Sequence, residues 1–260
     1  MVAIDERKGT GLTAPRPSPA HEIVTGCHVL GSGDHGDPVW GHVSRRDPDG
    51  RGVWLKAGLR GFDEVSGDDI IRIDSAGRSL AGSPAVPREY PIHTEILRVR
   101  DDVDSVVHCH PPYAIALAAS GQPLYAFSNA AGMFAAGVPR FERAVGLIDS
   151  AELGAAVARC LDSARALFLV GHGVVTVGSS VATAVMTAIL LERACHLQIL
   201  AMAAGGVDPA LQNPGQRYSH SESDAYLLRS WEYLVRRVHT AEVSAAADHH
   251  HPLCDGAQGD

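Results

Sequence analysis

The segment Val106-Val107-His108-Cys109-His110 gives the most specific indication of how this chain folds. Its β-branched start predicts a buried strand over 105–110. Alternate residues of a strand point to opposite faces, so His108 and His110 project together and Cys109 faces away. Two imidazoles about 7 Å apart at their Cα atoms can bind one metal ion. About one His-x-His pair is expected by chance from 14 histidines in 260 residues, so this pair needs support from other residues.

Strand and helix signals alternate on both sides of this segment. Apolar runs bounded by turn residues predict strands over 39–44, 52–56, 69–73, 105–110, 166–170 and 174–177. Apolar periodicity and capping residues predict helices over 89–100, 113–119, 151–162, 180–204 and 224–238. The alternation predicts a single α/β domain over 21–243. We expect a flexible, proline-containing N-terminal arm at 1–20 and a flexible C-terminal tail at 244–260.

Composition narrows the classes of function. A formal charge of −8 argues against nucleic-acid and acidic-membrane partners, which need a basic surface. Five cysteines without CxxC spacing are typical of a reducing compartment. No secretory signal is visible at the start, and the most apolar stretch, 181–191, is too short to span a bilayer. We therefore expect a cytoplasmic protein.

A third candidate ligand is the histidine of Gly171-His172-Gly173, which lies between two apolar β runs. Glycines on both sides allow a tight turn and a close approach of the backbone, leaving the imidazole exposed at a strand end. A turn with an incidental histidine is the alternative explanation. Together with the His-x-His pair, His172 indicates a metal that keeps open coordination positions, as a Lewis-acid catalyst requires.

The helix that leads into the His-x-His strand begins with chemically useful residues. Glu89 lies in its first turn, where a carboxylate is also favoured by the helix dipole alone. His93 lies four residues later on the same helical face. Arg88 could pair with a substrate carboxylate through its planar guanidinium, or it could be a solvated surface charge.

In this order, these residues resemble the class II aldolase/adducin family over about residues 39–206. The matching segments are Gly41-His42-Val43-Ser44, Glu89-Tyr90-Pro91-Ile92-His93-Thr94-Glu95-Ile96, Val106-Val107-His108-Cys109-His110, Gly171-His172-Gly173-Val174-Val175 and Leu190-Leu191-Glu192-Arg193. The resemblance implies an α/β/α sandwich on a mostly antiparallel central sheet, and a homotetramer with active sites at subunit contacts. It also implies one divalent metal ion per subunit, bound by His108, His110 and His172. Glu89 would then be the catalytic acid/base, a further ligand, or both. Such a donor set suits Zn²⁺, Mn²⁺, Fe²⁺ or Co²⁺.

The chain departs from the sugar-phosphate aldolases of this family at their phosphate-binding segments. Those enzymes use Gly-Asn-x-Ser, a Thr-x-Ser-Gly turn and paired serines before the acid. Here His42 replaces the asparagine, the turn reads Lys56-Ala57-Gly58, and Pro87-Arg88 replaces the serines. These exchanges resemble the decarboxylase branch of the family, which acts on hydroxylated aromatic carboxylates. The resemblance implies a metal-dependent, non-oxidative carboxy-lyase of aromatic compound catabolism, for which the conversion of 3,4-dihydroxyphthalate to protocatechuate is the first expectation. Hydroxypyridine dicarboxylates and prenylated hydroxybenzoates are the alternative substrates within this branch.

Four residues are expected to contact that substrate: Arg88, His42, His93 and Ser44. Two other functions stay open. One is an aldolase or epimerase acting on a sugar phosphate, which turnover of a sugar phosphate would favour. The other is a non-catalytic scaffold resembling the adducin head, for which metal-free purified protein would be evidence.

Overall fold

The structure, a computed structural model, describes residues 17–33, 35, 38–82, 85–143, 146–211 and 220–248; within 220–223 and 241–248 it describes the backbone only. The helices in this part of the chain are α1 (Pro19–Gly31), α2 (Tyr90–Val99), α3 (Pro112–Ala119), α4 (Ala151–Leu161), α5 (Val181–Ala203) and α6 (His220–Asp248). The strands are β1 (His42–Arg46), β2 (Val53–Lys56), β3 (Ile70–Ile73), β4 (Ser79–Ala81), β5 (Ser105–Cys109), β6 (Arg140–Phe141), β7 (Ala166–Leu169) and β8 (Gly173–Gly178). Short 3₁₀ helices occupy Gly67–Asp69, Gly132–Phe134 and Pro209–Leu211.

The eight strands form one sheet in the order β4-β3-β2-β1-β5-β8-β7-β6. Every pair is antiparallel except β6 and β7, which run parallel. This confirms the predicted α/β fold with a mostly antiparallel sheet. The strand β5 lies between β1 and β8, with His108 opposite His42 on one side and Val175 on the other. The segment that contains His108 therefore lies in the middle of the sheet.

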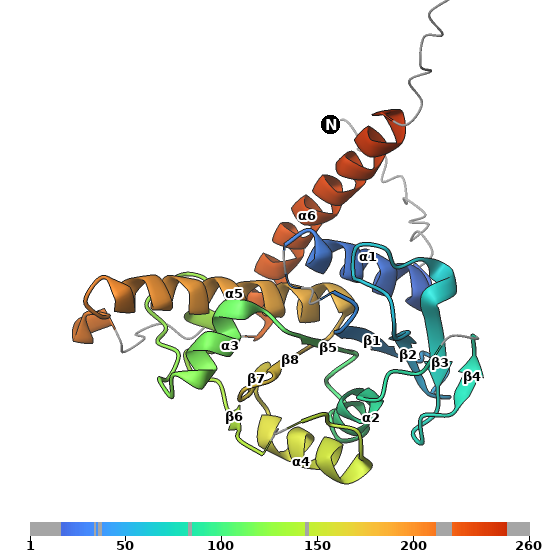
Figure 1. Ribbon diagram of the computed structural model, residues 1–260, viewed down its shortest axis with the longest axis horizontal. Helices are drawn as coiled ribbons and strands as arrows, with labels where there is room; N and C mark the ends of the chain where they lie inside the picture. The colour runs from blue at the N-terminus through green and yellow to red at the C-terminus, as the bar shows by residue number, and fades with distance from the viewer. Residues whose placement is uncertain are drawn as a thin grey trace, which may run out of the picture.

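Helices cover both faces of the sheet, as the expected α/β/α sandwich requires (Figure 1). One buried apolar cluster joins the sheet to α1, α3, α5 and α6, and it contains Val107 and Cys109. The second cluster joins the opposite face to α2 and α4, and it contains Val106. Adjacent residues of β5 thus enter different cores, so the predicted alternation is confirmed and Cys109 does face away from the histidines.

The folded part is longer at both ends than the predicted 21–243. The helix α1 begins at Pro19, where the Ser18 side chain accepts the His21 N–H at 3.2 Å. Proline is tolerated in the first turn of a helix because its missing N–H needs no partner there. At the other end, α6 continues to Asp248. The remainder of the predicted arm and tail, 1–16 and 249–260, lies outside the described residues.

The helix α5 is longer than the apolar stretch 181–191 that was expected to be too short to span a bilayer. It has 23 residues, which is long and apolar enough to cross a membrane by length and composition alone. It packs instead against β8, α1, α3 and α6, and it buries twelve of its residues, including Glu192. These contacts are those of a core helix.

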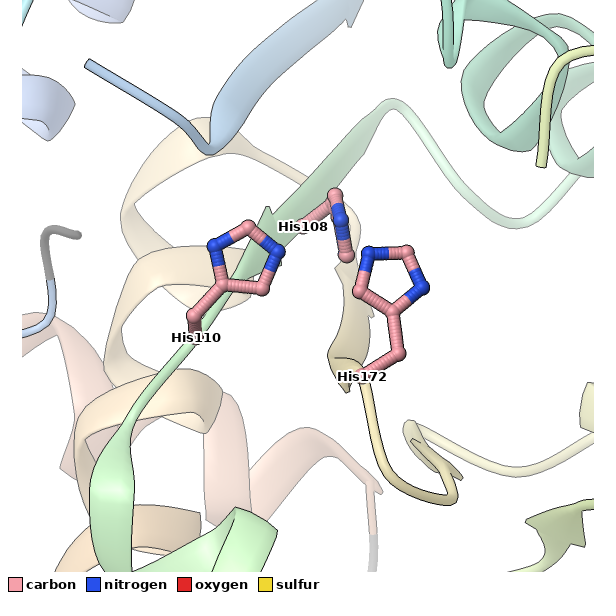
Figure 2. A group of neighbouring side chains, drawn as sticks. All are labelled: His108, His110 and His172. Carbon is pink, nitrogen blue, oxygen red and sulfur yellow. The ribbon is translucent and has the colours of Figure 1, made fainter. Parts of the chain in front are cut away.

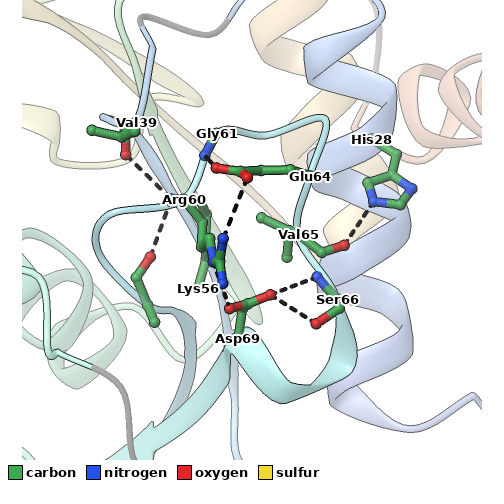
Figure 3. A network of polar contacts seen from close by, with 10 residues as sticks. His28, Val39, Lys56, Arg60, Gly61, Glu64, Val65, Ser66 and Asp69 are labelled. Atoms are coloured by element: carbon green, nitrogen blue, oxygen red, sulfur yellow. Dashed lines mark hydrogen bonds and ion pairs between the residues drawn. The ribbon is translucent and has the colours of Figure 1, made fainter.

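A network of polar contacts fixes the connection between β2 and β3 (Figure 3). The Arg60 guanidinium pairs with Asp69 at 3.1 Å and with Glu64 at 3.4 Å. Asp69 in turn accepts hydrogen bonds from the backbone N–H and the hydroxyl of Ser66. The connection also contacts α1, where a His28 ring nitrogen lies 2.7 Å from the Val65 carbonyl oxygen. The connection is therefore held by its own polar contacts and by a contact with α1.

Candidate metal centre

Three histidines from two neighbouring strands converge at one end of the sheet (Figure 2). His108 belongs to β5, His110 follows it directly, and His172 lies in the turn between β7 and β8. The candidate ligand atoms of the three side chains all lie within 4.8 Å of one another. The pairing of Cys109 with Val174 joins the two strands between these positions. The structure thus brings together the three residues singled out as metal ligands.

The two glycines beside His172 have different structural roles. Gly171 has a φ of +75° and open space around it, so it provides the left-handed turn. A Cβ atom on Gly173 would lie 2.6 Å from the Cys109 carbonyl oxygen and 2.7 Å from His110 Cδ2. Gly173 therefore leaves space for the ligand strand. The predicted exposure of His172 is wrong, since its side chain is only 13% exposed.

The contacts of His108 set its tautomer. Its Nδ1 lies 3.0 Å from the Val174 carbonyl oxygen, which can only accept, so Nδ1 carries the proton. Nε2 then presents a lone pair to the cluster, 3.3 Å from Oε2 of Glu89. The His172 Nε2 lies 3.6 Å from the other carboxylate oxygen. Several acceptors thus face one small volume, and a cation there would relieve their repulsion. This donor set fits a divalent metal ion.

The charges of the cluster agree with ligand forms. Burial, together with the charges of His108 and His172, lowers the pKa of His110 to about 3. Burial also lowers the pKa of His172. For Glu89, burial raises the pKa, but when the His108 imidazole carries a second proton, on Nε2, its hydrogen bond and charge, together with the Ile148 N–H, lower it to about 2. The outcome is neutral imidazoles at His110 and His172 beside an ionised carboxylate at Glu89.

The backbone of the segment just before α4 holds Glu89 in place. The Ile148 N–H donates to Oε1 of Glu89 at 2.9 Å, and the carboxylate is only 7% exposed. No sequence pattern could reveal this contact, because the two residues are 59 positions apart and a backbone amide has no sequence signature.

Two of the expected substrate contacts lie too deep to touch a substrate. Ser44 and His93 are both fully buried, and His93 Nδ1 lies 2.7 Å from the Ser44 hydroxyl oxygen. His42 lies between them and the cluster, with ring centroids 5.8 Å from His93 and 5.9 Å from His108. The alternation that places His42 and Ser44 on one face of β1 carries Ser44 inward, under α2. Their geometry makes Ser44 and His93 supports for the site.

The basic residues near the family's phosphate segments differ in exposure. The Arg88 side chain is 72% exposed and pairs with Asp149 at 2.5 Å. The Lys56 side chain is fully buried, and its Nζ donates to the carbonyl oxygens of Ala57 at 3.1 Å and Val39 at 3.5 Å (Figure 3). Burial lowers the pKa of Lys56. The Lys56-Ala57-Gly58 turn therefore does not present its amine to a phosphate.

This chain is similar to known proteins both in sequence and in fold. The class II aldolase and adducin N-terminal domain matches residues 21–199. The 3,4-dihydroxyphthalate decarboxylase of Arthrobacter keyseri is 30% identical over 203 residues, covering 71% of this chain and 79% of that protein. Decarboxylase NovR of Streptomyces niveus is 31% identical over 181 residues, covering 68% and 67%. The L-fuculose 1-phosphate aldolase from Glaciozyma antarctica PI12 shares the fold, with a TM-score of 0.72 at 23% identity over 87% of this chain and 90% of that one. This protein belongs to the class II aldolase/adducin family.

Proposed function

We propose that this protein is a divalent-metal-dependent decarboxylase of a hydroxylated aromatic carboxylate, with 3,4-dihydroxyphthalate as substrate and protocatechuate as product. The observation that carries the proposal is the group of three imidazoles facing Glu89, at 3.3 Å from His108 and 3.6 Å from His172. Relatives of about 30% identity that are named decarboxylases support a carbon–carbon lyase reaction of this kind.

His108, His110 and His172 would hold the metal ion, with Glu89 beside it as acid/base, further ligand or both. When bound, the metal would act as a Lewis acid that stabilises negative charge developing on a hydroxyl oxygen of the aromatic ring. The donor set suits Zn²⁺, Mn²⁺, Fe²⁺ and Co²⁺.

Glu89 can carry one proton through the reaction. Its low pKa keeps it ionised, so it can accept the proton of a ring hydroxyl. The same proton then passes from Glu89 to the ring carbon that bears the carboxylate, and the ring takes its ketone form. The bond to the carboxylate carbon breaks, carbon dioxide leaves, and the electron pair returns to the ring as a phenolate. A general acid/base of this kind contributes about 10²–10⁴-fold to a rate.

The substrate needs cationic or hydrogen-bonding groups for its carboxylates. Arg88 is the accessible candidate, and a substrate carboxylate would compete with Asp149 for its guanidinium. His42, 7% exposed and opposite His108 in the sheet, is the second candidate. Ser44 and His93 would not touch the substrate; they would hold His42 in position.

The test is carbon dioxide release from 3,4-dihydroxyphthalate by protein loaded with Mn²⁺ or Zn²⁺, with chelated protein as the control. We expect metal-dependent release with protocatechuate as the second product, and its loss in His108→Ala. Full activity of the chelated protein, or of His108→Ala, would refute the proposed site. If neither metal supports release, the named substrate is wrong, and other hydroxyaromatic acids and sugar phosphates should be assayed next.

The aldolase or epimerase alternative has less support. The fold it shares with the sugar-phosphate enzymes does not specify a substrate, and the buried Lys56 amine offers no phosphate contact. The scaffold alternative is disfavoured by the three convergent histidines. The homotetramer and the cytoplasmic location remain expectations, which a sedimentation measurement and a localisation experiment would test.

A further inference from the structure

The helix α3, which begins two residues after His110, has no ordinary N-terminal cap. Its N-cap residue is Pro111 and its first residue is Pro112, and neither has a side-chain oxygen that could accept a backbone N–H. The N–H groups of Tyr113 and Ala114 therefore need an acceptor from elsewhere, because unpaired N–H groups are costly to bury.

Glu192 of α5 is that acceptor. Its Oε1 accepts the Tyr113 N–H at 3.0 Å, and its Oε2 accepts the Ala114 N–H at 2.8 Å. The glutamate is buried in the middle of α5, and it lies 79 and 78 residues from its two donors. A carboxylate at the positive end of a helix dipole is a favourable arrangement. A second contact between the helices, the stacked rings of Tyr113 and His196 at 3.8 Å, lies beside it.

We propose that Glu192 is a positioning residue for the metal centre, because it fixes the start of α3 and so fixes the backbone that carries His110. This inference rests on the metal site proposed above. The chain at His110 is held on one side by the pairing of Cys109 with Val174. On the other side, the two prolines restrict rotation, so a shift of the α3 terminus passes to His110. Glu192 also lies near enough to this chain that its charge adds to burial in raising the pKa of Cys109.

Gln198 offers a matched control on the same helix. It is fully buried and also makes two hydrogen bonds to backbone, accepting the Tyr125 N–H at 2.7 Å and donating to the Pro123 carbonyl oxygen at 2.7 Å. These bonds anchor the chain that follows α3, at the end away from His110. Gln198→Leu thus removes a similar amount of buried polar contact without releasing the ligand segment.

The experiment compares Glu192→Leu, Glu192→Gln and Gln198→Leu with the parent protein. Co²⁺ is the probe, and its affinity and visible absorption spectrum are measured by titration. Hydrogen exchange of the Tyr113 and Ala114 amides is followed in the chelated proteins. We expect Glu192→Leu to weaken Co²⁺ binding by about 10–100-fold, the usual effect of losing a group that orients a metal ligand. It should also change the Co²⁺ spectrum and speed exchange at both amides.

The other variants make the result specific. Glu192→Gln keeps one acceptor oxygen and the side-chain volume, so it should bind Co²⁺ with intermediate affinity; it carries the test if Glu192→Leu does not fold. Gln198→Leu should lower the melting temperature but leave Co²⁺ affinity unchanged. Unchanged Co²⁺ affinity in both Glu192 variants would overturn the inference, as would equal weakening in Gln198→Leu. If the His172→Ala variant still binds Co²⁺ as the parent protein does, the metal centre and this inference are both overturned.

Discussion

Gly173→Ala is the substitution for which the structure gives the sharpest expectation. The added Cβ would lie 2.6 Å from the Cys109 carbonyl oxygen, 2.7 Å from His110 Cδ2 and 3.3 Å from His108 Cε1. The nearest of these atoms belongs to the backbone of β5, so rotation of a side chain cannot relieve the contact. The strands β5 and β8 must separate locally, and the two histidines must move.

The magnitude follows from overpacking in a buried, paired region. Inserting one carbon into such a site costs about 1–3 kcal/mol of folding free energy. Displaced ligands should weaken metal binding by about 10–100-fold, the range found when ligand orientation is lost. Gly171→Ala is the matched control, since a Cβ there meets no atom within 4 Å. Its φ of +75° makes alanine cost about 1–2 kcal/mol through backbone strain alone.

The assay has two parts. Urea unfolding of the chelated proteins measures the free energy of unfolding, and calorimetric titration with Zn²⁺ measures affinity. Both alanine variants should lose similar stability, but only Gly173→Ala should lose substantial Zn²⁺ affinity. If Gly173→Ala binds Zn²⁺ within about twofold of the parent, less than the loss expected for displaced ligands, or if Gly171→Ala is the weaker binder, the assignment of the two glycines is refuted.

Three further predictions concern protons and charge. Glu89→Gln should lower kcat by about 10²–10⁴-fold while most of the metal is retained, as judged by product assays and metal analysis; full activity would exclude Glu89 as acid/base. Arg88→Ala should raise KM for the dicarboxylate about tenfold with kcat nearly unchanged, and Asp149→Asn, which frees Arg88, should lower KM; the reverse pattern would contradict a substrate contact. Burial lowers the pKa of His93 from 6.5 to about 3, so between these values the unfolded chain binds more protons. In chelated protein the free energy of unfolding should therefore fall as pH falls from 6.5 to 3. His93 alone contributes about 1.4 kcal/mol per pH unit. The free energy of unfolding, measured with urea at several pH values, should therefore depend less steeply on pH in His93→Gln than in the parent. Equal pH dependence in the two proteins would show that His93 is not the cause.

The central strand and the long helices could be predicted because local sequence determines them. The two-residue period of β5 placed Val106, His108 and His110 on one face and Cys109 on the other. The serines 179 and 180 are both possible caps for the helix predicted over 180–204, and the Ser180 side chain accepts the Thr183 N–H. The predicted elements do not include α1, although Ile23, Cys27 and Leu30 follow a helical spacing and Ser18 caps its start. The strands β4 and β6 have three and two residues, too few to show a period.

The contacts that define the site could not be predicted in the same way. His93 with Ser44, Glu89 with the Ile148 N–H and Arg88 with Asp149 join residues 49 to 61 positions apart. Each depends on the order of strands in the sheet and on where α2 and α4 pack, which no local pattern encodes. Sequence patterns therefore pointed to the candidate residues. Only the fold shows which of them converge, which are buried behind the cluster and which pair at the surface.

The arrangement of the site explains how one fold can serve more than one carbon–carbon bond cleavage. The three histidines lie on or beside strands β5 and β8, so hydrogen bonds between strands hold their backbone. Glu89 and Arg88, in contrast, lie just before α2, where they contact the chain that leads into α4. A change in the residues just before α2 or α4 can then alter the proposed proton transfer and substrate binding, while the sheet keeps the geometry of the three histidines unchanged. Substrate class should accordingly follow from residues of these segments such as Arg88, and metal binding from the strand pair. Exchanging only the segments before α2 and α4 with those of a sugar-phosphate aldolase should change the substrate and preserve metal affinity.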